Sequence, residues 1–214
     1  MAPKTTTQLL HALLDCTAND IVPLTRKGVE SGCKVFGAAV LAKDTLEQVT
    51  VGTNTEAESP LLHGEITTIQ QFYRLPKESR PNARDTIFFC THEPCSLCLS
   101  GITWGGWDNF YYLFTYEETR DAFEIPHDLA ILEAVFKVPS TCAAETREQL
   151  ASRPLYNPIN KFFQSASVAA LLEALPEGQE KEELRQKVDH VKAEYNGLSL
   201  TYQRGKGGAD IPLP

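Results

Sequence analysis

The chain has 214 residues and a formal net charge of −8, and it is 42% hydrophobic and 22% charged. Its length suits one principal domain with additions rather than two full-sized domains. The composition excludes a disordered chain, and no apolar run reaches the roughly 18 residues that a membrane span requires. The first 14 residues lack a basic segment followed by an apolar block, so we predict a cytoplasmic protein without a membrane partner. The acidic charge disfavours nucleic acid, whose binding draws on Lys and Arg.

The first 60 residues predict helices followed by a pair of strands. Residues 7–30 carry apolar side chains at helical spacings and predict one or two helices, interrupted near Pro23. Residues 35–41 and 49–52 are short and β-prone, and a charged stretch separates them. We interpret these two segments as a hairpin.

Helices and strands then alternate along the chain. Residues 61–73 predict a helix, residues 86–90 a buried strand, residues 95–102 a second helix with Pro94 in its first turn, and residues 110–115 another strand. This alternation predicts an α/β fold, a three-layer α/β/α sandwich around a mixed sheet.

The pattern changes beyond residue 140. Residues 159–175 and 177–195 predict helices that Pro176 separates. We therefore predict a principal domain over residues 1–140 and a helical C-terminal extension over residues 141–214. Glycines are frequent near the end, so the extension is expected to finish in a flexible tail from about residue 204.

Cysteine usage indicates metal or redox chemistry rather than disulfides. Three disulfides could be drawn from six cysteines, but a chain of this length builds enough core without them. Cys95 and Cys98 form a Cys-x-x-Cys pair, which in an intracellular protein indicates a metal or a redox site. The other cysteines have no partner at metal-ligand spacing and are interpreted as structural: Cys16, Cys33, Cys90 and Cys142.

Two short segments carry the candidate metal site, His63-Gly64-Glu65 and the Cys95–Cys98 pair. Residues at i and i+3 share one face of a helical turn, so one metal can contact both sulfurs. A helix N-terminus also favours thiolates and lowers the pKa of a thiol. One imidazole and two thiolates are three protein ligands for one zinc ion per chain. A structural zinc uses four, so a fourth position is left for water or hydroxide, as in catalytic zinc sites.

The order of these segments, His-x-Glu and then Pro-Cys-x-x-Cys, is the signature of zinc deaminases. Together with Phe36-Gly37-Ala38-Ala39-Val40 and Gly52-x-Asn54, it makes residues 35–140 resemble the cytidine deaminase-like superfamily. The resemblance is nearest the branch of cytosine, guanine and tRNA adenosine deaminases. It implies a five-stranded sheet flanked by helices, hydrolytic deamination of a nucleobase or nucleobase-like heterocycle, and a homodimer. Glu65 would be the catalytic proton carrier, which takes a proton from water and helps ammonia to leave.

Two segments of the chain resemble deaminases with different substrates. His63-Gly64-Glu65-Ile66-Thr67-Thr68 is similar to fungal cytosine deaminase, which favours a free pyrimidine base. Thr119-x-Asp121-Ala122, with Asp128 seven residues after Asp121, is similar to guanine deaminases. Both substrate classes therefore remain open.

The same resemblance implies contacts to the base. Asn54 would bond a ring or carbonyl group, the backbone near Gly64 would read the edge of the base, and Asp121 would contact the leaving amine. Trp104 and Phe114 are candidates to stack on a flat heterocycle, because such pockets pair apolar faces with a few polar groups. The alternatives are a turn role for Asn54 and core packing for the aromatic residues.

Three other functions compete with that of a small-molecule deaminase. A tRNA adenosine deaminase needs a basic surface, which the charge of −8 disfavours. A catalytically silent, zinc-binding scaffold subunit has no need of Glu65. A redox protein would use Cys95 and Cys98 as a reversible disulfide and would hold no zinc.

Overall fold

The computed structural model describes residues 4–141, 145–206 and 211–213. Its centre is a five-stranded sheet with the order β2-β1-β3-β4-β5. β1 pairs with β2 and β3 in antiparallel fashion, whereas β4 and β5 continue the sheet in parallel. The strands are β1 (Gly37–Ala42), β2 (Gln48–Thr53), β3 (Thr86–His92), β4 (Asn109–Phe114) and β5 (Gln164–Ser167).

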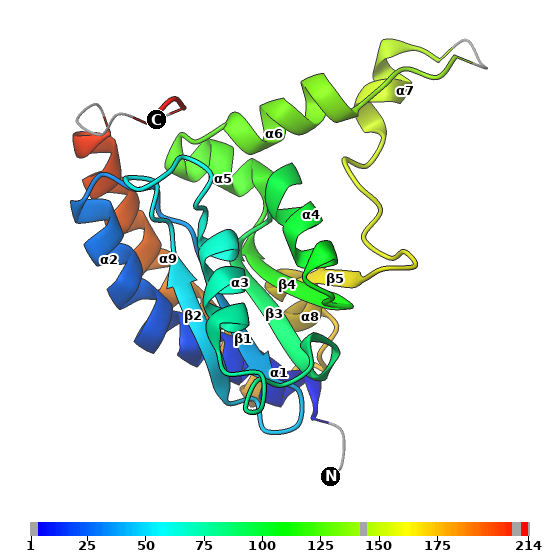
Figure 1. Ribbon diagram of the computed structural model, residues 1–214. Helices are drawn as coiled ribbons and strands as arrows, with labels where there is room; N and C mark the ends of the chain where they lie inside the picture. Colours follow the sequence, from blue (N-terminus) through cyan, green and yellow to red (C-terminus); the bar gives the residue numbers. More distant parts are fainter. Residues whose placement is uncertain (1–3, 142–144, 207–210, 214) are drawn as a thin grey trace.

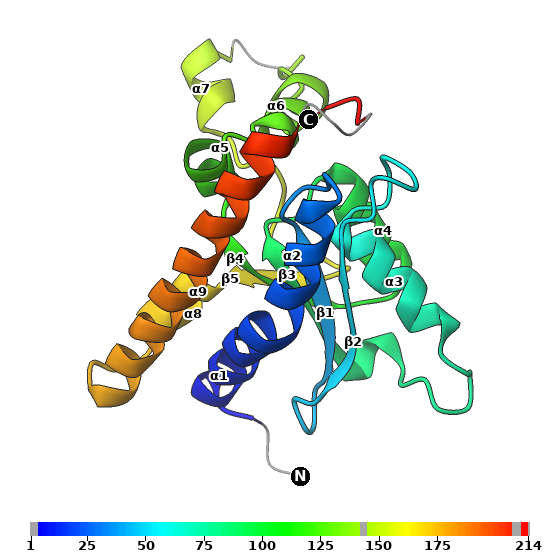
Figure 2. The same ribbon diagram turned by 90° about the vertical axis from the view of Figure 1, so that its left-hand side faces the viewer.

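Helices cover both faces of the sheet, which confirms the predicted α/β/α sandwich (Figures 1 and 2). One face packs against α1 (Thr6–Cys16), α2 (Val22–Glu30), α8 (Val168–Glu173) and α9 (Gln179–Gly205). The other face packs against α3 (Gly64–Arg74) and α4 (Ser96–Trp104). Successive side chains of β1 alternate between the two cores, as the pleat of a strand requires: Ala39 and Leu41 enter the first, Ala38 and Val40 the second.

Further short elements connect these layers. They are a π-helical turn at Thr17–Ile21, a 3₁₀ turn at Ala83–Asp85, α5 (Tyr116–Phe123), α6 (His127–Ile131), a second π-helical turn at Leu132–Phe136, and α7 (Arg147–Ser152). Within the described ranges, no helix combines the length and the apolar character that crossing a membrane requires. The five described cysteines are free thiols, and Cys142 lies outside the described residues.

The predicted interruption near Pro23 takes the form of a π-helical turn rather than a loop. α1, the turn and α2 follow one another without a gap. Pro23 lies in the first turn of α2, directly after the π-helical turn. The proline therefore marks the start of α2, and the helical run from α1 to α2 is not broken by a loop.

The predicted helix over residues 159–175 is wrong in its first part. Gln164–Ser167 form β5, which pairs with β4 from Asn109 to Tyr112, and only then does α8 begin. Pairing to the edge of β4 satisfies the backbone of this short polar segment and overrides its local preference. Ser167 then caps α8 by accepting a hydrogen bond from the Ala170 N–H.

The C-terminal third shares the core of the molecule. α9 runs from Gln179 to Gly205 and is longer than the predicted helix over residues 177–195. One face of α9 joins the core cluster that contains α1 and α2: Leu184, Val191, Tyr195, Leu198 and Tyr202. Ile211 is also buried.

His92, at the end of β3, is a core residue. Its imidazole stacks on the ring of Phe114 and contacts the edges of other aromatic rings. Its Nδ1 atom lies 2.9 Å from the hydroxyl of Thr91. The edge contacts come from Phe36, Phe123 and Tyr195.

We expect His92 to make the folded state sensitive to acid. Burial, aided by the charge of Lys192, lowers the pKa of His92 from 6.5 to about 3. The unfolded chain takes up this proton at a pKa near 6.5, so stability is complete above that pH and is lost as the pH falls toward about 3. The loss should reach about 1.4 kcal/mol per pH unit. Urea unfolding between about pH 7.5 and pH 5 measures it.

The non-titrating variant His92→Asn provides the control for this prediction, because Asn retains a hydrogen-bond acceptor for Thr91. Other groups titrate in the same range, so the informative quantity is the difference between the two pH slopes. Equal slopes in the parent protein and the variant would contradict the assignment of this acid sensitivity to His92.

Candidate metal centre

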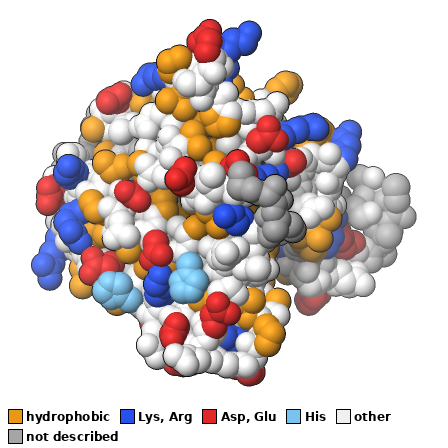
Figure 3. All heavy atoms as spheres, turned by 90° about the horizontal axis from the view of Figure 1, so that it is seen from below, with side chains coloured by type: hydrophobic (Ala, Val, Ile, Leu, Met, Phe, Trp, Pro, Cys, Tyr) orange, Lys and Arg blue, Asp and Glu red, His pale blue; other side chains and the backbone are white. Residues whose placement is uncertain are grey.

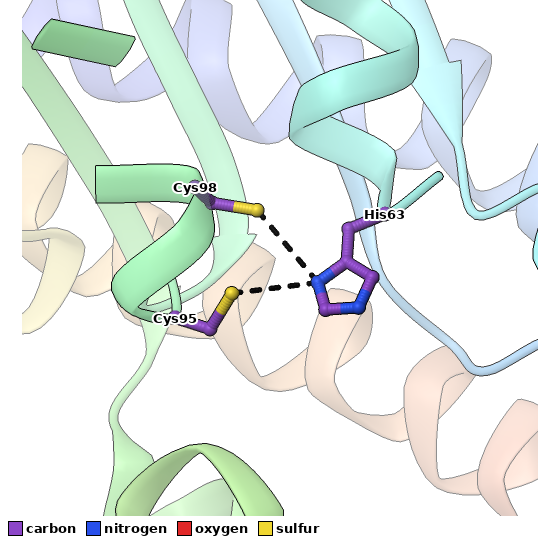
Figure 4. A group of neighbouring side chains, drawn as sticks. All are labelled: His63, Cys95 and Cys98. Carbon is purple, nitrogen blue, oxygen red and sulfur yellow. Dashed lines mark hydrogen bonds between the residues drawn. The ribbon is translucent and has the colours of Figure 1, made fainter. Parts of the chain in front are cut away.

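Three side chains meet where α3 and α4 begin (Figure 4). His63 is the residue before α3, Cys95 is the residue before α4, and Cys98 lies in the first turn of α4. Figure 4 shows both sulfurs directed toward the imidazole. Helix N-termini carry positive partial charge and free N–H groups, so this arrangement favours thiolate ligands.

The distances suit one tetrahedral zinc ion. The Nδ1 atom of His63 lies 3.4 Å from Sγ of Cys95 and 3.7 Å from Sγ of Cys98. Zinc bonds of about 2.0–2.3 Å at tetrahedral angles place nitrogen and sulfur ligands about 3.5 Å apart. All three ligand atoms lie within 4.8 Å of one another, and this is the only such group among the described residues. The residues present therefore fit a three-ligand zinc site.

The charges of the cluster favour a thiolate on Cys95. Hydrogen bonds from Cys98 and His63 lower the pKa of the Cys95 thiol to about 4, although burial opposes this. Burial raises the pKa of Cys98 well above its ordinary value. Burial alone would lower the pKa of His63, but its bond to Cys95 and the charges around it raise that pKa to about 9. The lowered pKa of Cys95 therefore favours its thiolate form, which is the form that binds a metal.

Glu65 lies next to the three ligands. It occupies the first turn of α3 and is buried, and its Oε2 atom accepts a hydrogen bond from Sγ of Cys98 at 3.3 Å. Burial, together with the negative charge of Cys95, raises the pKa of Glu65 to about 7. A carboxyl group with this pKa can both accept and release a proton near neutral pH.

A cavity of about 340 Å³ opens beside His63 and Cys95. Apolar side chains form most of its wall, among them Phe36, Leu97, Ile125 and Ile131. Its polar wall residues include Lys34, Glu56, His127 and Asp128. Apolar walls with a few polar groups are typical of sites for small planar ligands.

Comparison with known proteins agrees with this geometry. Residues 22–114 match the family described as the cytidine and deoxycytidylate deaminase zinc-binding region. The matched range contains His63, Cys95 and Cys98. No curated protein matches the sequence.

Solved structures of several deaminases are similar to the chain. Guanine deaminase from Bacillus subtilis is 25% identical, with a TM-score of 0.44, over 57% of this chain and 76% of that one. A structure from a study of A-to-I editing by tRNA:A34 deaminases is 18% identical, with a TM-score of 0.41, over 77% and 94%. Guanine deaminase from Nitrosomonas europaea is 12% identical, with a TM-score of 0.44, over 90% and 88%.

Asp128 is a site residue that the sequence analysis did not assign. It lies in the first turn of α6 and lines the cavity beside His63 and Cys95. Burial and the negative charge of Cys95 raise the pKa of Asp128 to about 7. The similarity of Thr119-x-Asp121-Ala122 to guanine deaminases included Asp128 and was the signal that could have identified it.

Asn54 is engaged with protein groups rather than facing the cavity. Its Oδ1 atom accepts a hydrogen bond from the N–H of Gly64 at 2.6 Å, and its Nδ2 atom donates to Oε2 of Glu56 at 2.9 Å. Gly64 itself packs against the backbone of Gly37. Neither Asn54 nor Gly64 lines the cavity, and their contacts to a base stay predictions.

The three remaining predicted base contacts also lie away from the cavity. Trp104 is 91% exposed at the far end of α4, away from the ligands at its start. Phe114 is buried in the core against His92. Asp121 lies on the exposed side of α5 and pairs with Arg120 at 2.6 Å. Aromatic and acidic residues are common near the motif, and only the packing separates core and surface positions from the cavity wall.

Proposed function

We propose that this protein is a zinc-dependent hydrolytic deaminase of a nucleobase or nucleobase-like heterocycle, of cytosine or guanine type. One observation carries the proposal: the cluster of His63, Cys95 and Cys98 lies beside the buried carboxyl group of Glu65. A scaffold subunit needs the ligands alone, whereas hydrolysis also needs a group that moves protons. The cavity next to the cluster provides room for a substrate.

Zinc bound by these three residues would supply a Lewis acid and would lower the pKa of a bound water to roughly 7. Glu65 would take a proton from the attacking water and deliver it to the ring nitrogen beside the amino-bearing carbon. It would then carry the second proton of the water to the departing amino group. Water and the amine are thereby converted into a carbonyl group and ammonia, and the Glu65 carboxylate is restored.

The cavity favours a free base over a nucleotide. Its volume of about 340 Å³ provides room for one or two fused rings. Asp128 faces it and, among the described residues, has no cation paired with it in the same way as Lys34 pairs with Glu56, so an ionised Asp128 would repel a phosphate group. Asp128 is instead placed to accept a hydrogen bond from an amino group or ring N–H of a base.

RNA is a poor candidate for the substrate. The face of the molecule in Figure 3 carries acidic and basic side chains next to one another, without a continuous basic area. Ion pairs such as Lys187 with Asp15, at 2.6 Å, neutralise basic groups locally. Figure 3 shows the side away from the cavity, so it is the net charge of −8 that disfavours RNA, because RNA binding depends on unneutralised Lys and Arg. Assembly as a homodimer stays a prediction from family resemblance.

We expect ammonia release from one free base and expect that release to depend on zinc. The zinc-loaded protein is assayed with cytosine, guanine, adenine and their nucleosides, then stripped with a chelator and reloaded. Activity should disappear on stripping and return with about one zinc ion per chain. No release from any compound with one zinc bound would favour a scaffold role. A reversible Cys95–Cys98 disulfide and no zinc would favour a redox protein.

A further inference from the structure

A buried ion pair forms part of the cavity wall. The Nζ atom of Lys34 lies 2.8 Å from Oε1 of Glu56, and their side chains are only 7% and 1% exposed. Both residues line the cavity that adjoins the metal ligands. Removing two charges from water costs several kcal/mol per ion, and an apolar pair is often at least as stable. This costly pair therefore calls for a functional explanation.

The hydrogen bonds of Glu56 leave it fully engaged. Its Oε1 atom accepts from Lys34 Nζ, and its Oε2 atom accepts from the backbone N–H of Lys34 at 2.8 Å and from Asn54 Nδ2 at 2.9 Å. These bonds hold the pKa of Glu56 below its ordinary value, although burial alone would raise it. Glu56 therefore serves to orient Lys34 and Asn54.

Asn54 connects the ion pair to the start of α3. Its Oδ1 atom holds the N–H of Gly64, between His63 and Glu65, at 2.6 Å. The oxygen and one N–H of the Asn54 amide are thus bonded to protein atoms, and Asn54 does not line the cavity. A hydrogen-bond donor for a ligand on this part of the cavity wall is therefore sought in a residue other than Asn54.

Lys34 is that residue. An ammonium group has three N–H donors, and among the described residues Nζ bonds only to Glu56. Glu56 neutralises the charge of Lys34, so the pair offers a strong hydrogen-bond donor without a net positive charge. Such a donor suits a neutral acceptor, such as a ring carbonyl oxygen, better than a phosphate.

We propose that Lys34 is a specificity-determining residue of this site and selects heterocycles that carry a ring carbonyl oxygen. The inference rests on the proposed function for its substrate class. It assigns reading of the base to Lys34 and a positioning role to Asn54 and Glu56. Asp128, across the same cavity, would accept a hydrogen bond from an N–H of that base.

Binding to matched ligand pairs tests the proposal. Cytosine is compared with 4-aminopyrimidine, and guanine with 2-aminopurine, because each pair differs in the ring carbonyl group and the ring N–H beside it; the Lys34 variant then separates the contribution of the carbonyl group. Titration calorimetry with zinc-loaded protein carrying Glu65→Ala measures binding without turnover. We expect the carbonyl compound of at least one pair to bind roughly tenfold to hundredfold more tightly, as a hydrogen bond from a charged donor implies.

The test variant is the double replacement Lys34→Met/Glu56→Gln in the same Glu65→Ala background. Lys34→Met alone would leave Glu56 as an unpaired buried charge and could prevent folding. The accompanying change Glu56→Gln removes that charge and keeps an oxygen that accepts from Asn54 and from the Lys34 backbone. The preference for the carbonyl compound should fall below about threefold, with zinc content and binding of the carbonyl-free compound unchanged.

The control variant is Lys43→Met, because Lys43 pairs with Asp108 outside the cavity. It should keep the full preference. The proposal is overturned if the parent shows no preference, if no compound binds, or if the double variant keeps the preference. A preference that the double variant loses, in a protein that deaminates none of the four compounds, supports the role of Lys34 and contradicts the proposed function instead.

Discussion

Replacement of Glu65 with alanine is expected to lower deamination about 10²–10⁴-fold while zinc content stays near one ion per chain. Glu65 is not one of the three clustered ligands, so its loss leaves the metal contacts in place. Its buried carboxyl group, with a pKa raised to about 7 by burial and by Cys95, is the proton carrier next to the cluster. Zinc analysis and ammonia release from the same preparation measure both quantities.

Glu65→Gln separates proton transfer from packing. Gln has nearly the same size and retains an oxygen that can accept the hydrogen bond from Cys98, but it cannot carry a proton. We expect it to be as inactive as the alanine variant. Loss of zinc from both variants would instead assign Glu65 to holding the site together, and full activity in Glu65→Gln would contradict proton transfer by this residue.

Replacement of Gly64 with alanine is expected to destabilise the protein and to weaken its zinc site. An added Cβ atom would lie 2.8 Å from Cα of Gly37 and 2.9 Å from the carbonyl oxygen of Phe36. These are backbone atoms at the start of β1, so they cannot rotate away, and α3 must move instead. Overpacking of this kind costs roughly 1–3 kcal/mol. His63 and Glu65 flank Gly64, so activity should fall about 100-fold for a displacement near 1 Å.

Gly197→Ala is the matched control for this prediction. Gly197 lies within α9, and an added Cβ atom would meet nothing within 4 Å. Alanine favours a helix over glycine by about 1 kcal/mol, so this variant should be at least as stable as the parent. Thermal unfolding and competitive zinc titration compare the variants. A Gly64→Ala protein with parental stability and zinc affinity would show that α3 can retreat from β1 without consequence.

The fold could be predicted where local patterns agree with the tertiary environment. β3 is buried on both faces, and its continuous apolar run already predicts a strand. β5 could not be recognised, because Gln164–Ser167 are polar and small and become a strand only by pairing with β4. The spacing of hydrophobic residues indicates which side chains an element buries. Whether a segment pairs as a strand also depends on whether the tertiary structure brings it next to the edge of a sheet.

The metal ligands were predictable because chemistry restricts their spacing. Cys95 and Cys98 must share one helical turn to contact one ion, and His63 belongs to the same recognisable pattern. No comparable rule applies to Trp104 and Phe114. Aromatic side chains serve equally well in a core, on a surface or against a ligand, and the packing places one at each of the first two.

The sequence by itself determined the α/β/α architecture and the shared helical turn of Cys95 and Cys98, because both follow from short-range periodicity. Its resemblance to the zinc-deaminase signature added His63 and Glu65 to the candidate site. Tertiary structure decided the cavity wall. Lys34, Glu56 and Asp128 come from separate parts of the chain and meet only when the segment before β1, the loop after β2 and α6 assemble around the ligands. Lys34 and Glu56, which are residue types common on surfaces, form a buried ion pair there. Asn54 forms hydrogen bonds with Gly64 and Glu56 in the same assembly.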